Sequence, residues 1–105
     1  VFHSFSGSAE IAKRLQKHGW YISLSGPCTF DNAVNLREAI SQCDINLLLT
    51  ETDSPYLTPC PFRGKRNDSS YITYIIEKIA EIKNESFETV SRITKENAMK
   101  LFNIL

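Results

Sequence analysis

The stretch INLLLTETDSP, residues Ile45 to Pro55, contains a nearly continuous apolar run that leads directly into two carboxylates, Glu51 and Asp53. Apolar runs of this length, from Ile45 to Thr50, are typical of strands that are covered on both faces, as in parallel sheets. Pro55 follows the two acids and favours an extended conformation for Ser54 before it. The stretch therefore predicts a buried parallel strand with two acidic side chains at its carboxyl end.

Two further strands and two helices are predicted before this strand. Val1 to Phe5 and Trp20 to Ser25 are rich in the β-branched and aromatic residues that suit strands. Ser8 can cap a helix that ends at His18-Gly19, and Asp31 can cap a second helix. The apolar stripe of that second helix comprises Ala33, Val34, Leu36, Ala39 and Ile40.

Three helices are predicted after it. The first runs from about Ser70 to Lys83, and two short helices follow, capped by Ser86 and Thr94. Strands that alternate with helices imply right-handed crossovers and a parallel α/β sheet. Three such strands form either a small open sheet or a slice of a larger barrel, and residues 1–105 are expected to belong to one domain.

Composition excludes several classes of protein. The chain is 42% hydrophobic and 23% charged, as ordinary globular proteins are, and it has no apolar run of the ~20 residues that a membrane helix requires. Twelve cations balance twelve anions, which argues against a broad nucleic-acid-binding face but allows a local cationic loop. Three widely spaced cysteines argue against a disulfide framework and a thiolate zinc site.

Polar residues at the carboxyl ends of the predicted strands are the first candidates for a site. Ligands of parallel α/β folds bind at this rim, where we expect His3, the Ser25-Gly26 turn and the Glu51/Asp53 pair to meet. A lone histidine near an apolar run is more often structural than a ligand, but its place at a strand exit favours function. His18, near a helix C-terminus, is explained by structure alone.

Glu51 and Asp53 have the same parity, so both side chains lie on one face of an extended chain. Two buried carboxylates repel each other, and a divalent metal would relieve that repulsion. A histidine, an aspartate and a nearby glutamate suit Zn²⁺, Mn²⁺ or a similar ion, although two ligands alone do not make a closed site. The alternative is that Asp53 only forms an Asx-turn into Ser54-Pro55.

The loop PFRGKRN, Pro61 to Asn67, is the remaining candidate. Arg63 can make a fork-like contact with phosphate oxygens, and Lys65 and Arg66 add positive charge. The alternative is a solvated cationic loop. Beside a metal at the same rim, the loop would suit hydrolysis of a phosphodiester.

Several of these motifs together resemble one known family. The stretches HSFSGSAEIAKRL, GWYISLSGPCTF, LLLTETDSPYL, PFRGKRN and TKENAMKLFNIL are similar, in this order, to the C-terminal portion of the TatD family of metal-dependent deoxyribonucleases. The resemblance implies the C-terminal slice of a TIM (β/α)₈ barrel, a divalent metal ion (Mg, Mn or Zn), a DNA substrate and a cytoplasmic or nuclear location.

The resemblance also implies roles for single residues. His3 and Asp53 match metal ligands, and Asp53 is suited to orient or deprotonate the attacking water. Glu51 matches a residue that lies behind the metal and holds the ligand geometry. Arg63 and Asn67 match a loop that is expected to bind substrate or to organise the rim. Asp68-Ser69 departs from the family's usual Glu-Pro at the end of this loop.

The family's other ligands, a His-x-His, a central glutamate and a further histidine, precede the matched region. The sequence therefore predicts a TatD-like DNA hydrolase of which this piece alone is inactive, with exposed sheet edges through which it self-associates. Two alternatives stay open. One is another metal-dependent amidohydrolase with a small substrate, and the other is a non-catalytic fragment that binds a partner or oligomerises.

Overall fold

The computed structural model describes residues 1–103, and its sheet is parallel, as predicted. Strand β1 (Ile22–Leu24) pairs in register with β2 (Leu48–Thr50), so that Ile22 lies opposite Leu48. The predicted first strand is reduced to a parallel bridge between Phe2 and Ile22. The Phe2 amide donates to the Tyr21 carbonyl (2.9 Å) and the Ser23 amide to the Phe2 carbonyl (3.0 Å), which makes the bridge, and the Phe5 amide extends it by donating to the Ser23 carbonyl (2.9 Å).

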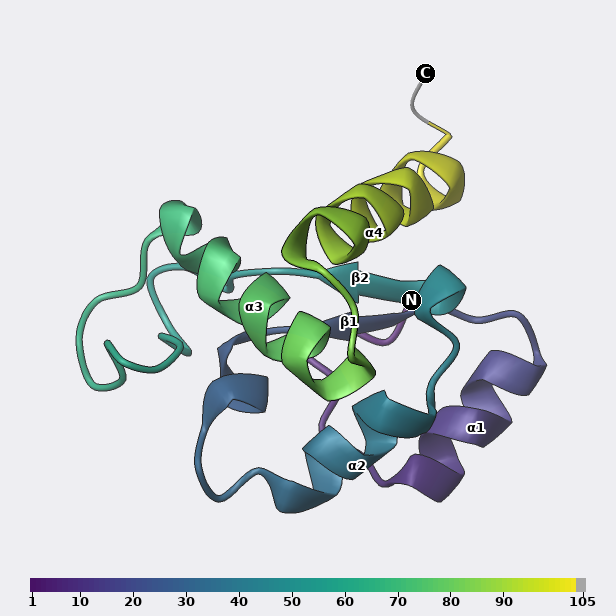
Figure 1. The fold of residues 1–105 in the computed structure, drawn as a ribbon, viewed down its shortest axis with the longest axis horizontal. Coiled ribbons are helices and arrows are strands. Elements are labelled where there is room, and N and C mark those ends of the chain that lie inside the picture. Colours follow the sequence, from purple (N-terminus) through teal and green to yellow (C-terminus); the bar gives the residue numbers. More distant parts are fainter. Residues whose placement is uncertain (104–105) are drawn as a thin grey trace.

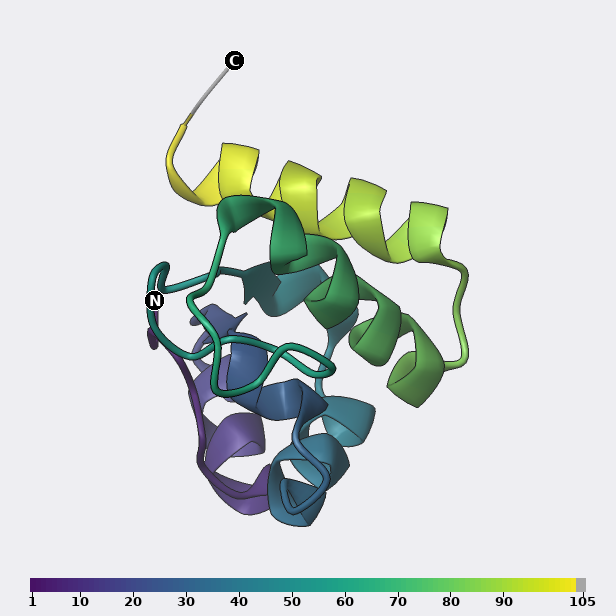
Figure 2. The same ribbon diagram turned by 90° about the vertical axis from the view of Figure 1, so that its left-hand side faces the viewer.

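The helices cover the strands in chain order. Helix α1 (Ala9–Lys17) contacts α2 (Val34–Gln42), α2 contacts α3 (Ile72–Lys83), and α3 contacts α4 (Phe87–Leu101). In Figure 1, α1 and α2 lie below the strands, α3 crosses in front of them and α4 lies above, along β2. Figure 2 shows the same order from the side. A row of helices outside parallel strands is the arrangement of a barrel segment.

The core lies between this row and the strands. Ile22, Leu24 and Leu48 point from the strands toward the helices and are almost fully buried. They belong to one cluster with residues from all four helices, including Ala12, Ile40, Ile75, Ile79 and Val90. Burying these side chains is the main stabilising term of the fold.

Both caps of α1 agree with the sequence. The Ser8 hydroxyl accepts a hydrogen bond from the Ile11 amide (3.3 Å), and the chain leaves the helix through Gly19, which has a φ of +76°. The ring of His18 stacks on Trp20 with centroids 4.7 Å apart, a structural role. The predicted Asp31 cap of α2 is wrong, because that helix begins later, at Val34, without a side-chain cap.

The turn before α2 explains its late start. The Arg37 guanidinium reaches back from the helix and donates to the carbonyls of Phe30 (2.5 Å) and Asp31 (3.0 Å). The Ala33 amide also donates to the Phe30 carbonyl (3.1 Å). These bonds hold residues 30–33 in a separate turn, so the Asp31 side chain does not reach the first amides of α2.

The remaining elements contain two further differences. Residues Ile45–Leu47, predicted as strand, form the 3₁₀ helix η2, which Asp44 caps. The two predicted C-terminal helices are one continuous helix, α4, which Ser86 caps. The Thr94 hydroxyl is buried and donates to the Val90 carbonyl (2.9 Å), so Thr94 lies inside α4 and does not cap a helix. The short helices η1 (Gly26–Thr29) and η3 (Ser69–Tyr71) complete the fold.

Cys28 and Cys43 are buried and Cys60 is half-buried, and all three are free thiols. Among residues 1–103, no helix combines the length and the apolar character needed to cross a bilayer.

Candidate metal centre

The carboxyl ends of the strands meet at one rim, as expected from the sequence. His3 follows the Phe2 bridge, Ser25 follows β1 and Glu51 follows β2. The Glu51 amide donates to the Leu24 carbonyl (2.9 Å), which extends the β1–β2 ladder by one residue. The ladder therefore places the start of the Glu51–Asp53 segment beside the ends of the other two strands.

His3, Glu51 and Asp53 form a cluster in which one possible ligand atom from each lies within 4.8 Å of the others. His3 Nδ1 lies 2.5 Å from Glu51 Oε1, and His3 Nε2 lies 3.3 Å from Asp53 Oδ1. The His3 side chain is 67% exposed, whereas those of Glu51 and Asp53 are 18% and 24% exposed. The imidazole thus stands between two largely covered carboxylates, with one side open to solvent.

The two carboxylates converge for a different reason than parity in an extended strand. Strand β2 ends at Thr50, and Asp53 has a left-handed backbone with a φ of +56°. A turn, and not continued extension, brings Asp53 back to His3. The proposed Asx-turn does not account for Asp53 either, because it is the Thr52 hydroxyl that accepts hydrogen bonds from the Ser54 amide (3.4 Å) and hydroxyl (3.1 Å).

The segment that carries His3 also binds the Glu51 carboxylate through a hydrogen bond. Glu51 Oε2 accepts a hydrogen bond from the Ser4 amide (3.2 Å), and the Ser4 hydroxyl lies 2.7 Å from the hydroxyl of Ser25, which is buried. Ser4 has a φ of +46°. The sequence did not predict a role for Ser4. The one feature that could have indicated it is its position next to His3 at the end of a predicted strand.

The donor set fits a divalent cation. Glu51 Oε1 is buried and, despite its closeness to His3 Nδ1, receives no hydrogen bond of acceptable geometry. A buried carboxylate oxygen without a hydrogen bond is costly, and added positive charge nearby lowers that cost. Two atoms that each lie about 2.1 Å from one ion are roughly 3 to 3.4 Å apart at tetrahedral and octahedral angles. The separation of His3 Nε2 and Asp53 Oδ1 falls in this range.

The geometry also separates the roles of the two carboxylates. Asp53 faces Nε2 of His3, and Glu51 faces Nδ1. A histidine that binds a metal through one nitrogen usually donates from the other to a carboxylate, which fixes its tautomer and orientation. His3 Nε2 and Asp53 Oδ1 could therefore hold the ion. Glu51 Oε1 lies 2.5 Å from His3 Nδ1, close enough to orient the ring once the two atoms align as donor and acceptor.

The structure keeps Arg63 and Asn67 out of this cluster. Arg63 is exposed, and its guanidinium lies 3.8 Å from the centroid of the Phe30 ring. Asn67 is 5% exposed, and its side-chain amide donates to backbone carbonyls within the loop after β2. Substrate binding by Arg63 stays a prediction.

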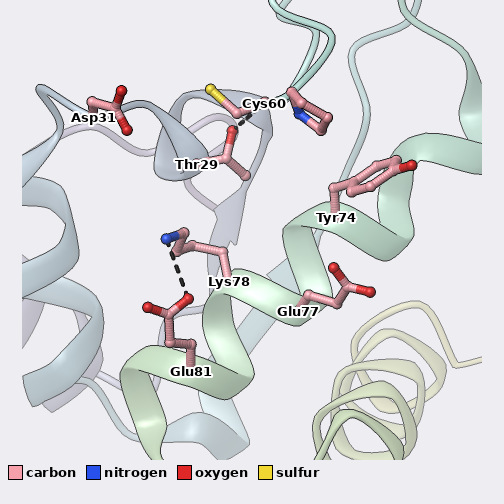
Figure 3. A pocket seen from close by; sticks show the side chains of 8 residues that line it. Thr29, Asp31, Cys60, Tyr74, Glu77, Lys78 and Glu81 are labelled. Carbon is pink, nitrogen blue, oxygen red and sulfur yellow. Dashed lines mark hydrogen bonds and ion pairs between the residues drawn. The ribbon is translucent and has the colours of Figure 1, made fainter.

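A larger cleft lies elsewhere. It has a volume of about 390 Å³ and lies between η1, the loop around Cys60 and α3, as Figure 3 shows. None of its residues belongs to the His3 cluster, and the carboxylate of Glu81 in it pairs with Lys78 (3.3 Å). A smaller cavity of about 250 Å³ is lined by both His3 and Glu51. Two members of the cluster, His3 and Glu51, therefore border the smaller cavity and not the larger cleft.

Comparisons with known proteins point to one family. The profile of the family described as "TatD related DNase" matches residues 1–103. The chain is 49% identical to the "uncharacterized metal-dependent hydrolase YabD" of Bacillus subtilis, over 99% of this chain and 41% of that protein. It is 41% identical to the "uncharacterized metal-dependent hydrolase YcfH" of Escherichia coli K12, over 99% of this chain and 39% of that protein. The expected divalent metal agrees with these names.

Solved structures have the same fold. The crystal structure of YjjV, a TatD homologue from Escherichia coli K12, superposes with a TM-score of 0.89 at 28% identity, over 98% of this chain and 40% of that one. A TatD family hydrolase from Entamoeba histolytica gives 0.79 at 21% identity, over 90% and 39% of the two chains, and supports the fold alone.

The chain spans about two fifths of the length of these relatives. The strands and helices described above are accordingly a segment of a TIM barrel, with the His3 cluster at the carboxyl ends of its strands. Because the family profile matches nearly the whole chain, the chain belongs to the TatD related DNase family.

Proposed function

We propose that the complete polypeptide in which this segment occurs, called the full-length protein below, is a metal-dependent hydrolase that cleaves phosphodiester bonds of DNA. The observation that carries the proposal is the convergence of His3, Glu51 and Asp53 at the strand ends, directly before a cationic loop. The family description names DNase activity, whereas the relatives are named only as metal-dependent hydrolases. DNA as the substrate is therefore the more specific part of the proposal.

The residues of the segment would have different roles in this reaction. His3 Nε2 and Asp53 Oδ1 would hold the ion, and Glu51, whose Oε1 lies 2.5 Å from Nδ1, would keep the imidazole in place. A divalent cation (Mg, Mn or Zn) at this place supplies Lewis-acid stabilisation of phosphoryl oxygens and lowers the pKa of water. The Asp53 carboxylate, which is 24% exposed, is suited to orient the attacking water and to accept its proton.

The loop after Asp53 supports a substrate that carries phosphates. Residues 54–67 contain no acid, although the chain as a whole has equal numbers of acids and bases. Arg63, Lys65 and Arg66 lie in this loop, and all three are exposed. The side chain of Tyr56 in the same loop is an exposed aromatic (74%) on which a base could stack. These side chains suit a DNA strand that approaches the metal site.

The test uses purified full-length protein and a fluorescent single-stranded oligonucleotide, with Mg²⁺, Mn²⁺ or Zn²⁺ added after chelation. We expect cleavage that depends on the metal and falls at least ~100-fold in Asp53→Asn, since a removed electrostatic group typically costs that much. Asp31→Asn is the matched control, because Asp31 is exposed and lies outside the cluster. Its activity should equal that of the wild type.

Two further results interpret the outcome. Arg63→Ala should raise KM for the oligonucleotide more than it lowers kcat, because it removes binding that is equal in ground and transition states. If the metal-loaded protein hydrolyses a small amide or ester but does not cleave DNA, DNA is rejected as the substrate. That result would favour the alternative of a small-substrate amidohydrolase.

A further inference from the structure

Asn67 binds the loop on both sides of Asp53. Its side-chain Nδ2 donates to the Thr52 carbonyl (2.5 Å) and to the Tyr56 carbonyl (2.7 Å). Its side-chain Oδ1 accepts a hydrogen bond from the backbone amide of Asp68 (2.8 Å). The backbone amide of Asn67 donates to the Pro55 carbonyl (3.0 Å). One buried side chain thus ties together the residue before Asp53 and the residue three positions after it.

The segment between these two carbonyls has an unfavourable backbone conformation. Asp53 has a φ of +56°, in the left-handed region that residues other than glycine adopt uncommonly, although aspartate does so more often than most. The Asp53 carbonyl accepts from the Tyr56 amide (2.8 Å), so residues 53–56 form a tight turn. Such a conformation persists only where surrounding contacts hold it, and the two bonds from Asn67 Nδ2 are contacts of this kind.

The conformation of this turn sets the direction of the Asp53 side chain. If Asp53 returned to the right-handed or extended region, its carboxylate would leave His3 Nε2, which lies 3.3 Å from it. The side chain of Asn67 has no spare donor for a substrate, because both hydrogens of its amide are used by the loop carbonyls and the residue is 5% exposed.

We infer that Asn67 is a positioning residue of the metal site: it holds the Asp53 turn so that the carboxylate faces His3, and it does not contact substrate. This inference rests on metal binding by His3 and Asp53 in the proposed function, but not on DNA as the substrate. The sequence left two roles open for Asn67, binding substrate and organising the rim. The inference assigns it the second.

The test measures Mn²⁺ binding to metal-stripped full-length protein by isothermal titration calorimetry, without substrate. We expect Asn67→Ala to weaken Mn²⁺ binding about 10- to 100-fold, as removal of groups that orient metal ligands usually does. In the DNA assay, kcat at a fixed Mn²⁺ concentration should fall while KM stays within about twofold of the wild-type value.

Asn97→Ala is a closely matched control. Asn97 is also buried (2% exposed), and its Nδ2 also donates to two carbonyls, those of Ile45 (2.9 Å) and Leu48 (2.8 Å). These carbonyls lie at the opposite end of β2 from Asp53. We expect Asn97→Ala to lower the unfolding temperature but to leave Mn²⁺ affinity unchanged, which separates positioning from general stability.

Asn67→Asp is the second variant, because it keeps the size and the Oδ1 acceptor but replaces the donor with a carboxylate oxygen. It should weaken Mn²⁺ binding at least as much as Asn67→Ala. Circular dichroism reports folding of each variant. If neither variant folds while Asn97→Ala does, the inference is overturned, since Asn67 would then serve the whole fold.

Three other results would also overturn it. These are wild-type Mn²⁺ affinity in a folded Asn67 variant, an equal loss of affinity in Asn97→Ala, and a raised KM for DNA with unchanged Mn²⁺ affinity, which would place Asn67 on the substrate. If the full-length protein binds Mn²⁺ through Asn67-dependent contacts but does not cleave DNA, the inference holds and the proposed substrate fails.

Discussion

The backbone of Leu57 lies directly against Gly26. A Cβ placed on Gly26 would stand 1.8 Å from the Leu57 carbonyl oxygen and 3.1 Å from the Pro59 nitrogen. Gly26 is the residue after Ser25, at the end of β1, and Leu57 lies in the loop that follows Asp53. The loop that carries the Asp53 turn is therefore seated on the end of the neighbouring strand by backbone contact, which only a glycine permits.

Gly26→Ala should displace this loop. The methyl group would meet backbone atoms that cannot turn away, so we expect a loss of about 1–3 kcal/mol in the free energy of unfolding, as overpacked sites show. Because the loop begins beside Asp53, Mn²⁺ affinity should fall as well. Denaturant unfolding and calorimetry check both. Gly64→Ala is the control within the same loop, since no atom lies within 4 Å of its Cβ position, although its φ of +91° adds strain. Equal metal affinity in Gly26→Ala and wild type would contradict the prediction.

Thiol reactivity should follow burial. Burial raises the pKa of the Cys28 thiol to about 12 and also raises the pKa of Cys43, whereas Cys60 is half-buried. Since the thiolate is the reactive form, iodoacetamide at pH 8 should modify Cys60 first in the native protein. Cys28 should react only after unfolding. Peptide mass spectrometry of a labelling time course checks this order, and native labelling of Cys28 at the rate of Cys60 would disprove it.

The Asp68 carboxylate should make stability depend on pH. Its Oδ1 accepts hydrogen bonds from the Ser70 amide (2.8 Å) and hydroxyl (2.7 Å) at the start of η3, and these bonds lower the pKa of Asp68. A carboxyl whose folded pKa is lowered stabilises the fold above its unfolded pKa of about 3.9, and this contribution is lost as pH falls through the folded pKa. Asp68→Ala should therefore be less stable than wild type at pH 7, with a smaller difference below about pH 4.

Unfolding titrations at pH 7 and pH 3 measure this difference. Ser70→Ala removes only the hydroxyl donor and should retain part of the pH dependence. If the free energies of unfolding of wild type and Asp68→Ala differ by the same amount at both pH values, the ionised carboxylate does not stabilise the fold more than the protonated form does.

Residues 1–105 alone should not cleave single-stranded DNA in the presence of Mg²⁺ or Mn²⁺. Catalytic metal sites usually have three protein ligands plus an open position, and here the described residues bring only His3 and Asp53 to the ion, with Glu51 behind them. The sheet of two strands and one bridge leaves open edges, so the piece should also self-associate. An activity assay and size-exclusion chromatography test these statements. Cleavage that Asp53→Asn abolishes, or a stable monomer, would contradict them.

Local signals in the sequence predicted most elements of the fold. The caps at Ser8 and Ser86 and the left-handed exit at Gly19 are present, since each depends on a few neighbouring residues. Predictions failed where distant groups competed. Arg37 holds the turn that contains Asp31. Thr94 is buried inside α4 and donates to the Val90 carbonyl, while the neighbouring Asn97 amide binds α4 to η2 and β2.

The sequence by itself determined the parallel order of strands and helices and the rim where His3, Glu51 and Asp53 would meet, because alternation and strand polarity are read from the chain. Only the tertiary structure decided how they meet. Asp53 turns back through a left-handed conformation, and Asn67, at the other end of the same loop, supplies the hydrogen bonds on either side of it. Contacts between residues that are not neighbours in the chain set the direction of these side chains, and no local pattern encodes them.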